Sequence, residues 1–181
     1  MAAALHPPAS TPTAADEEAD MKVNKVLVPL DGSRLAEAAL TPAVELLREN
    51  PAATLVLLRA AEATRVPGTD PAEAQFAVVH EAESYLDAVA ARLARQGITQ
   101  VTTSVWYGPP AAAIVEAAQV GHVDLIVMST HGRSGVGRLI LGSVAESVLR
   151  GTRTAILLVR DAAAPIVTPT AGPPREEVSH V

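Results

Sequence analysis

The sequence predicts an α/β fold, in which one open, doubly wound, five-stranded parallel sheet is covered by four helices. Between residues 23 and 161, short apolar runs rich in Val and Leu alternate with longer segments of helical periodicity. This alternation is typical of a parallel sheet with helical crossovers. Turns rich in small residues follow the first and the fourth apolar runs, at residues 29–33 and 129–143. Ligands of such sheets bind beyond the carboxyl ends of the strands, so these turns are the expected functional segments.

The first apolar run, residues 26–29, predicts the first strand. Ser33 then caps a helix that continues to about residue 48 with its apolar side chains on one face. Pro42 lies inside this helix and should kink it or shift its hydrogen bonds. Residues 54–59, rich in Val and Leu, predict a second, buried strand.

The second helix has a strong start signal in Asp70, Pro71 and Glu73, which are a capping acid, a proline and a glutamate. We expect this helix to continue to about Gln96 and to do nothing more than pack on the sheet. The remaining elements continue the alternation: a strand over 101–106, a helix over 109–121, a strand over 124–128, a helix over 144–149 and a strand over 155–159.

The bulk composition excludes several classes of protein. The chain of 181 residues has a net charge of -6, which argues against general binding to nucleic acids or to membrane surfaces. The absence of cysteine excludes disulfides, zinc–thiolate sites and thiol nucleophiles. No apolar run approaches the roughly 20 residues of a membrane span. Aromatic residues make up only 2% of the chain, so the core is expected to be aliphatic.

Both ends of the chain differ from the middle. Residues 1–22 contain three prolines and an acidic cluster without the basic and apolar regions of a secretory signal, so we expect a disordered leader and a cytoplasmic protein. Met21 precedes the first strand, which leaves open that translation starts there. Residues 162–181 are proline-rich and are expected to form a disordered tail. The folded domain is therefore predicted over residues 23–161.

The loop between the fourth strand and the last helix has the position of an anion site, because backbone N–H groups and the positive end of a helix meet there. It does not match two common phosphate loops. Gly137 and Gly142 have the spacing of a Walker loop, but Ser143 stands where that loop needs lysine. Gly135 and Gly137 begin a dinucleotide-binding motif, but Ile140 occupies the place of its third glycine.

The segment from Ser129 to Ser143 resembles the nucleotide loop of the universal stress protein family, whose pattern is Gly-x2-Gly, nine residues, and Gly-Ser or Gly-Thr. Gly132, the nine residues that follow it and Gly142-Ser143 match, whereas Ser129 replaces the first glycine. The resemblance extends to residues 28–33, 57–60 and 154–159, which are similar to the family's first turn, second strand end and last strand.

This resemblance implies an adenine nucleotide alpha hydrolase-like fold with the strand order 3-2-1-4-5. It also implies a homodimer paired through the fifth strand, and ATP binding, accompanied by Mg2+, in the subgroup that keeps the loop. Carried over by position, the residues around adenine and ribose are Pro29, Leu30, Asp31 and Ala60. The near wall is formed by Met128, Ser129 and Gly132, and the phosphates are held by Gly142, Ser143 and Val144.

Several of these residues also have a purely structural interpretation. Ser143 and Glu146 have the spacing of a capping box, which would satisfy the helix's own N–H groups. Asp31 precedes Gly32 and is either a turn residue or a ligand of ribose or metal. His131 is interpreted as a loop residue rather than an acid–base catalyst. Arg133 and Arg138 either screen phosphate charge or are solvated.

Three functions follow for this chain. The first is an ATP-binding regulatory protein of the stress response with little or no turnover, because neither paired catalytic carboxylates nor a lysine serve the phosphates. The second is a nucleotide-free dimeric scaffold of the same fold that acts through protein partners, and the replacement at Ser129 favours it. The third is an adenylate-transferring enzyme, which is disfavoured because the domain leaves no room for a substrate domain. The apolar fifth strand independently predicts dimerisation, because an uncovered edge strand promotes aggregation.

Overall fold

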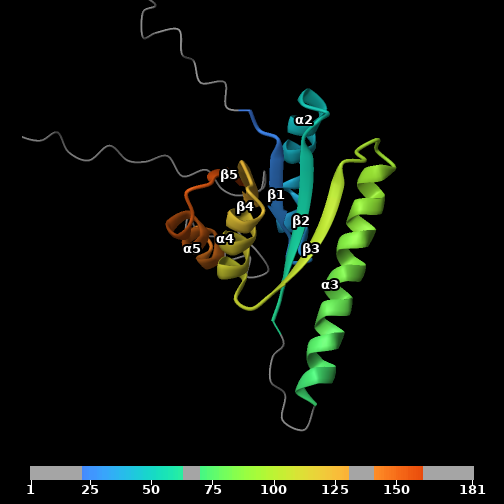
Figure 1. Ribbon diagram of the computed structural model, residues 1–181, viewed down its shortest axis with the longest axis vertical. Helices are drawn as coiled ribbons and strands as arrows, with labels where there is room; N and C mark the ends of the chain where they lie inside the picture. The colour runs from blue at the N-terminus through green and yellow to red at the C-terminus, as the bar shows by residue number, and fades with distance from the viewer. Residues whose placement is uncertain (1–21, 63–69, 131–140, 161–181) are drawn as a thin grey trace, which may run out of the picture.

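The computed structural model describes residues 22–62, 70–130 and 141–160, which form one sheet with helices on both of its faces (Figure 1). The strands are β1 (Lys25–Pro29), β2 (Thr54–Ala61), β3 (Val101–Tyr107), β4 (Leu125–Ser129) and β5 (Ala155–Val159). The helical segments are α1 (Arg34–Glu37), α2 (Leu40–Glu49), α3 (Pro71–Ala94), α4 (Pro110–Val120) and α5 (Ser143–Gly151). All strand pairs are parallel and the order is β3-β2-β1-β4-β5, which confirms the expected fold class and strand order.

The central strand β1 separates two hydrophobic cores, because successive side chains of a strand point to opposite faces. Val26 and Val28 pack with α1, α2 and α3, whereas Leu27 packs with α4 and α5. These three side chains are fully buried. The unbroken apolar pattern of β1 and β4 is therefore the pattern of strands covered on both faces, which parallel sheets require.

The first predicted helix is observed as two segments. The break falls at Ala38 and Ala39, whose N–H groups donate to the carbonyls three residues earlier, at 3.2 Å and 3.1 Å. Pro42 explains the position of the break, because a proline ring clashes with the carbonyl of the residue four positions earlier, here Ala38. The expectation of one helix from Ser33 to about residue 48 is thus corrected to a short α1 followed by α2, whereas the expected shift of hydrogen bonds near Pro42 is observed.

Two of the predicted helix caps are confirmed by hydrogen bonds. The Ser33 hydroxyl accepts the N–H of Ala36 at 3.1 Å, and the Asp70 carboxylate accepts the N–H of Ala72 at 2.8 Å. Asp70 starts α3, and the N-terminal part of that helix extends beyond the carboxyl ends of the strands (Figure 1). Its first buried residue is Ala82, so residues 71–81 are free to border whatever lies at that end of the sheet.

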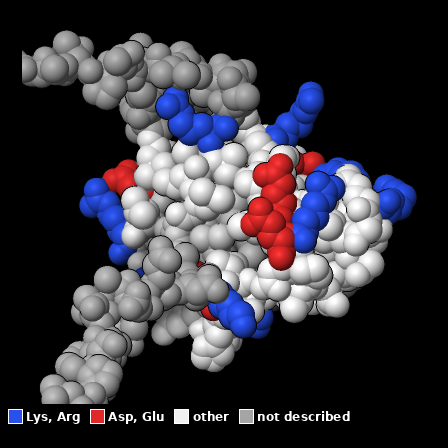
Figure 2. Space-filling view, turned by 90° about the horizontal axis from the view of Figure 1, so that it is seen from above, with Lys and Arg blue, Asp and Glu red and all other residues white. Residues whose placement is uncertain are grey.

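At the opposite end of the sheet, where the strands begin, the described acidic and basic side chains lie next to each other (Figure 2). Within the described ranges, no helix combines the length and the apolar character that crossing a bilayer requires.

Candidate functional site

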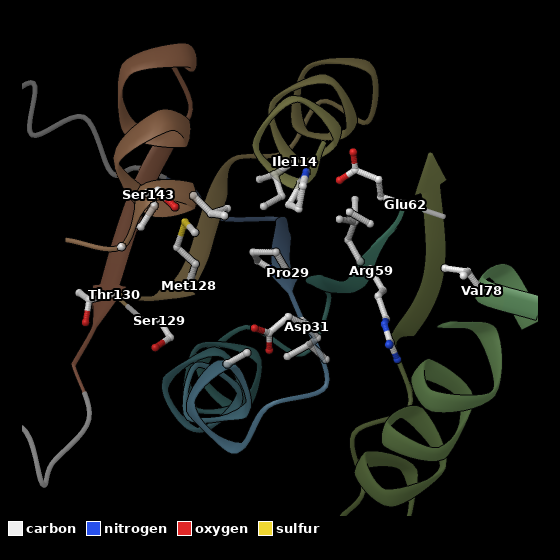
Figure 3. A pocket seen from close by; sticks show the side chains of 18 of the residues that line it. Pro29, Asp31, Arg59, Glu62, Val78, Ile114, Met128, Ser129, Thr130 and Ser143 are labelled. Atoms are coloured by element: carbon white, nitrogen blue, oxygen red, sulfur yellow. The ribbon is translucent and has the colours of Figure 1, made fainter. Parts of the chain in front are cut away.

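A pocket of about 520 Å³ lies at the carboxyl ends of β1, β2 and β4 (Figure 3). β1 pairs with β2 on one side and with β4 on the other, so the direction in which the chain adds strands reverses at β1. Such a reversal leaves a crevice between the loops that leave the two neighbouring strands. The pocket therefore occupies the position that the fold offers for a ligand, and its volume is in the usual range for small-molecule sites.

All of the predicted site residues within the described ranges line this one pocket. They are Pro29, Leu30, Asp31, Ala60, Met128, Ser129, Gly142, Ser143 and Val144. The turn after β1 and the end of β4 thus border the same cavity, as expected. Gly132, His131, Arg133 and Arg138 lie outside the described residues.

The part of the pocket toward α4 is apolar. Pro29 and Met128 come from neighbouring strand ends, and Ile114 of α4 faces them (Figure 3). Leu58 lies beneath with an exposed fraction of 1%. This surface can bury an uncharged ring system of a ligand, because transferring apolar area from water is favourable.

The N-terminus of α5 forms another wall, and its geometry corrects the capping-box interpretation. Gly142 is the N-cap residue, so the cap position offers no side chain that could accept a hydrogen bond from the first turn of the helix. Ser143 is already the first helical residue, which places its hydroxyl out of reach of the N–H groups that a capping serine satisfies. Glu146 instead accepts a hydrogen bond from Arg150, at 2.7 Å.

The consequence is a helix start at the edge of the pocket whose first backbone N–H groups have no hydrogen-bond acceptor among the described residues. The first N–H groups of a helix have no partner within the helix, and they carry the positive end of its dipole. The chain segments on either side of the loop are joined at their base, because the N–H of Gly142 donates to the carbonyl of Thr130 at 2.8 Å. The N–H of Thr130 in turn donates to the carbonyl of Val159 at 2.9 Å, which ties this point to β5. An anion is the ligand group that such a site favours.

Asp31 is held in the turn after β1 by a local hydrogen bond. Its carboxylate accepts the N–H of Ser33 at 2.8 Å, and Gly32 between them has φ +86°. That left-handed conformation is readily adopted only by glycine, which explains the Asp-Gly pair. The structural role of Asp31 is therefore observed, while its half-buried side chain also lines the pocket (Figure 3).

Four residues for which the sequence predicts no role in the site line the other end of the pocket, two at the end of β2 or just after it and two in α3. They are Arg59, Glu62, Val78 and Glu81. The expectation that α3 only packs on the sheet is therefore wrong, since two of these residues belong to it. The available signal was the position of Arg59, a charged residue inside an otherwise apolar strand end.

Arg59 is held between two residues of α3. Its guanidinium donates to the carboxylate of Glu81 at 2.7 Å and lies 5.1 Å from the centre of the Tyr85 ring. The Tyr85 hydroxyl donates to Glu37 at 2.9 Å, and Glu37 also pairs with Arg92 at 2.5 Å. Burial, followed by the hydrogen bond to Glu37, raises the pKa of Tyr85 well above its ordinary value. Through Tyr85 and Glu37, these contacts connect Arg59 at the pocket to α1.

The fold and the pocket define an open, doubly wound α/β protein with a ligand site at the strand-order reversal. The family model described as the universal stress protein family matches residues 22–160. A universal stress protein of Methanocaldococcus jannaschii is 31% identical over 141 residues, which cover 75% of this chain and 81% of that protein. The chain belongs to the universal stress protein family.

Solved structures of this family have the same fold. The universal stress protein UspA from Lactobacillus plantarum is 27% identical, with a TM-score of 0.67 over 77% of this chain and 99% of its own. A universal stress protein in complex with cAMP is 24% identical, with a TM-score of 0.60 over 76% and 97% of the two chains. A family protein from Arabidopsis thaliana with AMP bound is 14% identical, with a TM-score of 0.57 over 77% and 93%. At these last two identities the likeness establishes the fold alone.

Proposed function

We propose that this protein binds an adenine nucleotide in the pocket above β1, with ATP and Mg2+ as the physiological ligand, and acts as a cytoplasmic regulatory sensor of the stress response. The observation that carries the proposal is the uncapped start of α5 next to an apolar surface. A nucleotide has the matching pair of properties, since it joins an apolar ring system to an anionic phosphate group.

The dimensions of the pocket fit this ligand class. The base would lie against Pro29, Ala60 and Met128, and the phosphates would meet the N–H groups of Ser143 and Val144. The ribose would then lie near Asp31, whose carboxylate is an acceptor for a hydroxyl donor. Among the described residues that line the pocket, Arg59 is the only cation, so Mg2+ would supply positive charge to the triphosphate.

The relatives with bound nucleotides support the choice of adenine. One solved structure of this fold contains cAMP and another contains AMP. Efficient turnover is not expected, because among the described residues the phosphate end of the pocket carries backbone N–H groups and no acid–base pair. Binding would therefore change the conformation or the partners of the protein rather than consume the nucleotide.

We further propose that the protein works as a homodimer paired through β5. This strand lies at the edge of the sheet and pairs only with β4 among the described strands. Leu157, near its centre, has an exposed fraction of 39%, and Leu149 of the adjacent α5 has 50%. A second copy would cover both the apolar side chains and the edge of the strand.

The alternative is a scaffold of the same fold that binds no nucleotide and acts through protein partners. Ser129 favours it, because a side chain stands at a pocket position where the family loop has glycine. The residue has an exposed fraction of 9%, so its side chain takes up space at the pocket wall.

Calorimetric titration of the full chain, first stripped of nucleotide by unfolding and refolding, distinguishes the two. Mg-ATP, AMP and cAMP are the test ligands, and Mg-GTP and Mg-CTP are the matched controls. The proposal expects micromolar binding of adenine nucleotides, with Mg-ATP tightest, and much weaker binding of the controls. A refolded protein that binds none of them supports the scaffold and contradicts the proposal.

A further inference from the structure

Arg59 and Glu81 form an ion pair whose two members differ strongly in burial. The Arg59 side chain has an exposed fraction of 10%, whereas that of Glu81 has 68%. A charge as buried as that of Arg59 requires a partner, because an unpaired charge away from water is costly. Glu81 can satisfy this requirement and can also swing into solvent, since most of its side chain is already there.

The guanidinium of Arg59 also has spare hydrogen-bonding capacity. The group carries five N–H donors. Within the described part of the chain, one of its terminal nitrogens donates to Glu81, and no other acceptor is bonded to it. The guanidinium also makes a cation–π contact with the Tyr85 ring, which uses none of its N–H donors. The fork is therefore fixed in position and can bind a planar or tetrahedral anion that displaces Glu81.

The position of Arg59 determines which part of a ligand it would meet. β2, β1 and β4 are consecutive in the sheet, so Arg59 lies about two strand spacings, roughly 10 Å, from the β4 end where α5 begins. A nucleotide that crosses β1 with its 5′-phosphate at α5 has its nucleoside portion on the Arg59 side. An anion bound by Arg59 is then a second one, carried by the nucleoside.

We propose that Arg59 is a second anion-binding point of the pocket, and that the ligand class includes adenine nucleotides with a phosphate on the ribose in addition to the one at the 5′ position. Glu81 occupies this point when no such ligand is bound. The inference rests on the proposed function, because it assumes that the 5′-phosphate is held at α5.

Two other carboxylates line the pocket, and their negative charge limits the affinity that a second phosphate can gain from Arg59. Asp31, in the turn after β1, and Glu62, which follows β2, both line the pocket, and the Glu62 carboxylate points toward α4 (Figure 3). One oxygen of Asp31 already accepts the N–H of Ser33, and the Glu62 side chain is exposed to water. Water therefore screens Glu62, and Arg59 remains the strongest local determinant for an incoming phosphate.

The test compares AMP with adenosine 2′,5′-bisphosphate and adenosine 3′,5′-bisphosphate, titrated calorimetrically into the refolded, nucleotide-free full chain without divalent metal. One of the two bisphosphates should bind about tenfold more tightly than AMP, as expected for a charge-assisted hydrogen bond. The better isomer identifies the ribose position that Arg59 reads. Arg59→Met should abolish this preference, so that AMP and both bisphosphates bind to the variant with similar affinity.

Glu81→Gln provides the decisive variant, because the residue lies on the surface and its loss should not unfold the protein. If Glu81 is a displaceable occupant, Glu81→Gln should strengthen bisphosphate binding by about two- to fivefold, the usual value of an exposed ion pair. Glu83→Gln, which removes the same charge from an exposed position of α3 that does not line this pocket, should leave it unchanged.

The outcomes separate the two proposals. A protein that binds AMP but shows no preference for either bisphosphate, or in which Glu81→Gln weakens bisphosphate binding, overturns the role of Arg59 and leaves the nucleotide site intact. A wild-type protein that binds neither AMP, Mg-ATP nor a bisphosphate overturns both. If Arg59→Met does not fold, the comparison of the Glu81 and Glu83 variants still decides the question.

Discussion

Replacing Gly142 with aspartate should stabilise the protein and at the same time abolish nucleotide binding. Gly142 is the N-cap residue of α5, with φ -57° and ψ 147°. Every L-amino acid can adopt this extended conformation, so a side chain introduces no backbone strain. The new carboxylate would accept hydrogen bonds from the first turn of the helix, which are the donors that a phosphate would use.

The two effects have opposite signs and different sizes. An aspartate cap in place of glycine, with its favourable interaction with the helix dipole, should raise the free energy of unfolding by a few tenths to about 1 kcal/mol. Repulsion between the carboxylate and a phosphate charge roughly 5 Å away amounts to about 3 kcal/mol at an effective dielectric constant of about 20, or roughly a 200-fold weaker Kd. Competition for the same N–H donors adds to this loss.

Urea unfolding and calorimetric titration with Mg-ATP, carried out on the same preparation, measure both effects. Gly142→Asn is the matched control, because it caps the helix without a charge and should lose much less affinity. Unchanged nucleotide affinity in Gly142→Asp would show that the phosphates do not meet α5. A less stable variant would refute the assignment of Gly142 as the N-cap residue.

Three further perturbations test other parts of the molecule. Tyr85→Phe should reduce the stability that the protein loses at alkaline pH. Burial and the hydrogen bond to Glu37 raise the pKa of Tyr85 in the folded protein. Above about pH 10 the tyrosine therefore releases its proton only in the unfolded chain, which favours unfolding. Urea unfolding at about pH 8 and 11 checks this, and an equal loss in both proteins contradicts it. Leu157→Lys at the exposed edge of β5 should convert a dimer to a monomer in light scattering, while Val120→Lys, on α4 and 65% exposed, should not; a dimer that survives Leu157→Lys places the interface elsewhere. Ser33→Ala removes the acceptor of the Ala36 N–H and should cost about 1 kcal/mol of unfolding free energy, whereas an unchanged urea midpoint would show that the cap contributes nothing.

Features set by neighbouring residues were predictable from the sequence. The apolar runs of β1 and β4, the capping side chains of Ser33 and Asp70, and the place of the glycine-containing loop depend on residues a few positions apart. The strand order came from the family resemblance, since periodicity identifies strands without saying which ones pair. Once β1 lies between β2 and β4, the turn at Asp31 and the start of α5 necessarily border one pocket.

The boundaries of two predicted helices depended on competing local interactions, and the sequence pattern does not show which of these interactions is stronger. Pro42 predicts a kink or a shift of hydrogen bonds in the helix. Only the structure shows that the helix is divided in two near Ala38, whose carbonyl the proline ring would otherwise meet. The spacing of Ser143 and Glu146 matched a capping box, yet α5 begins one residue too early for the serine to serve as the cap. Glu146 then pairs with Arg150, a contact that is equally local and equally compatible with the sequence.

The charged end of the pocket was decided by tertiary structure alone. Arg59 and Glu81 are 22 positions apart and belong to a strand and a helix whose contact follows from the way α3 crosses the sheet. Their patterns in the sequence are those of an isolated charge in a strand and a solvated charge on a helix. Sequence therefore determined the strands, most of the helices and the place of the glycine-containing loop between β4 and α5, because these follow from short-range backbone and side-chain chemistry. The tertiary structure determined which distant side chains complete the pocket, because only the packing of α3 against β2 brings them together.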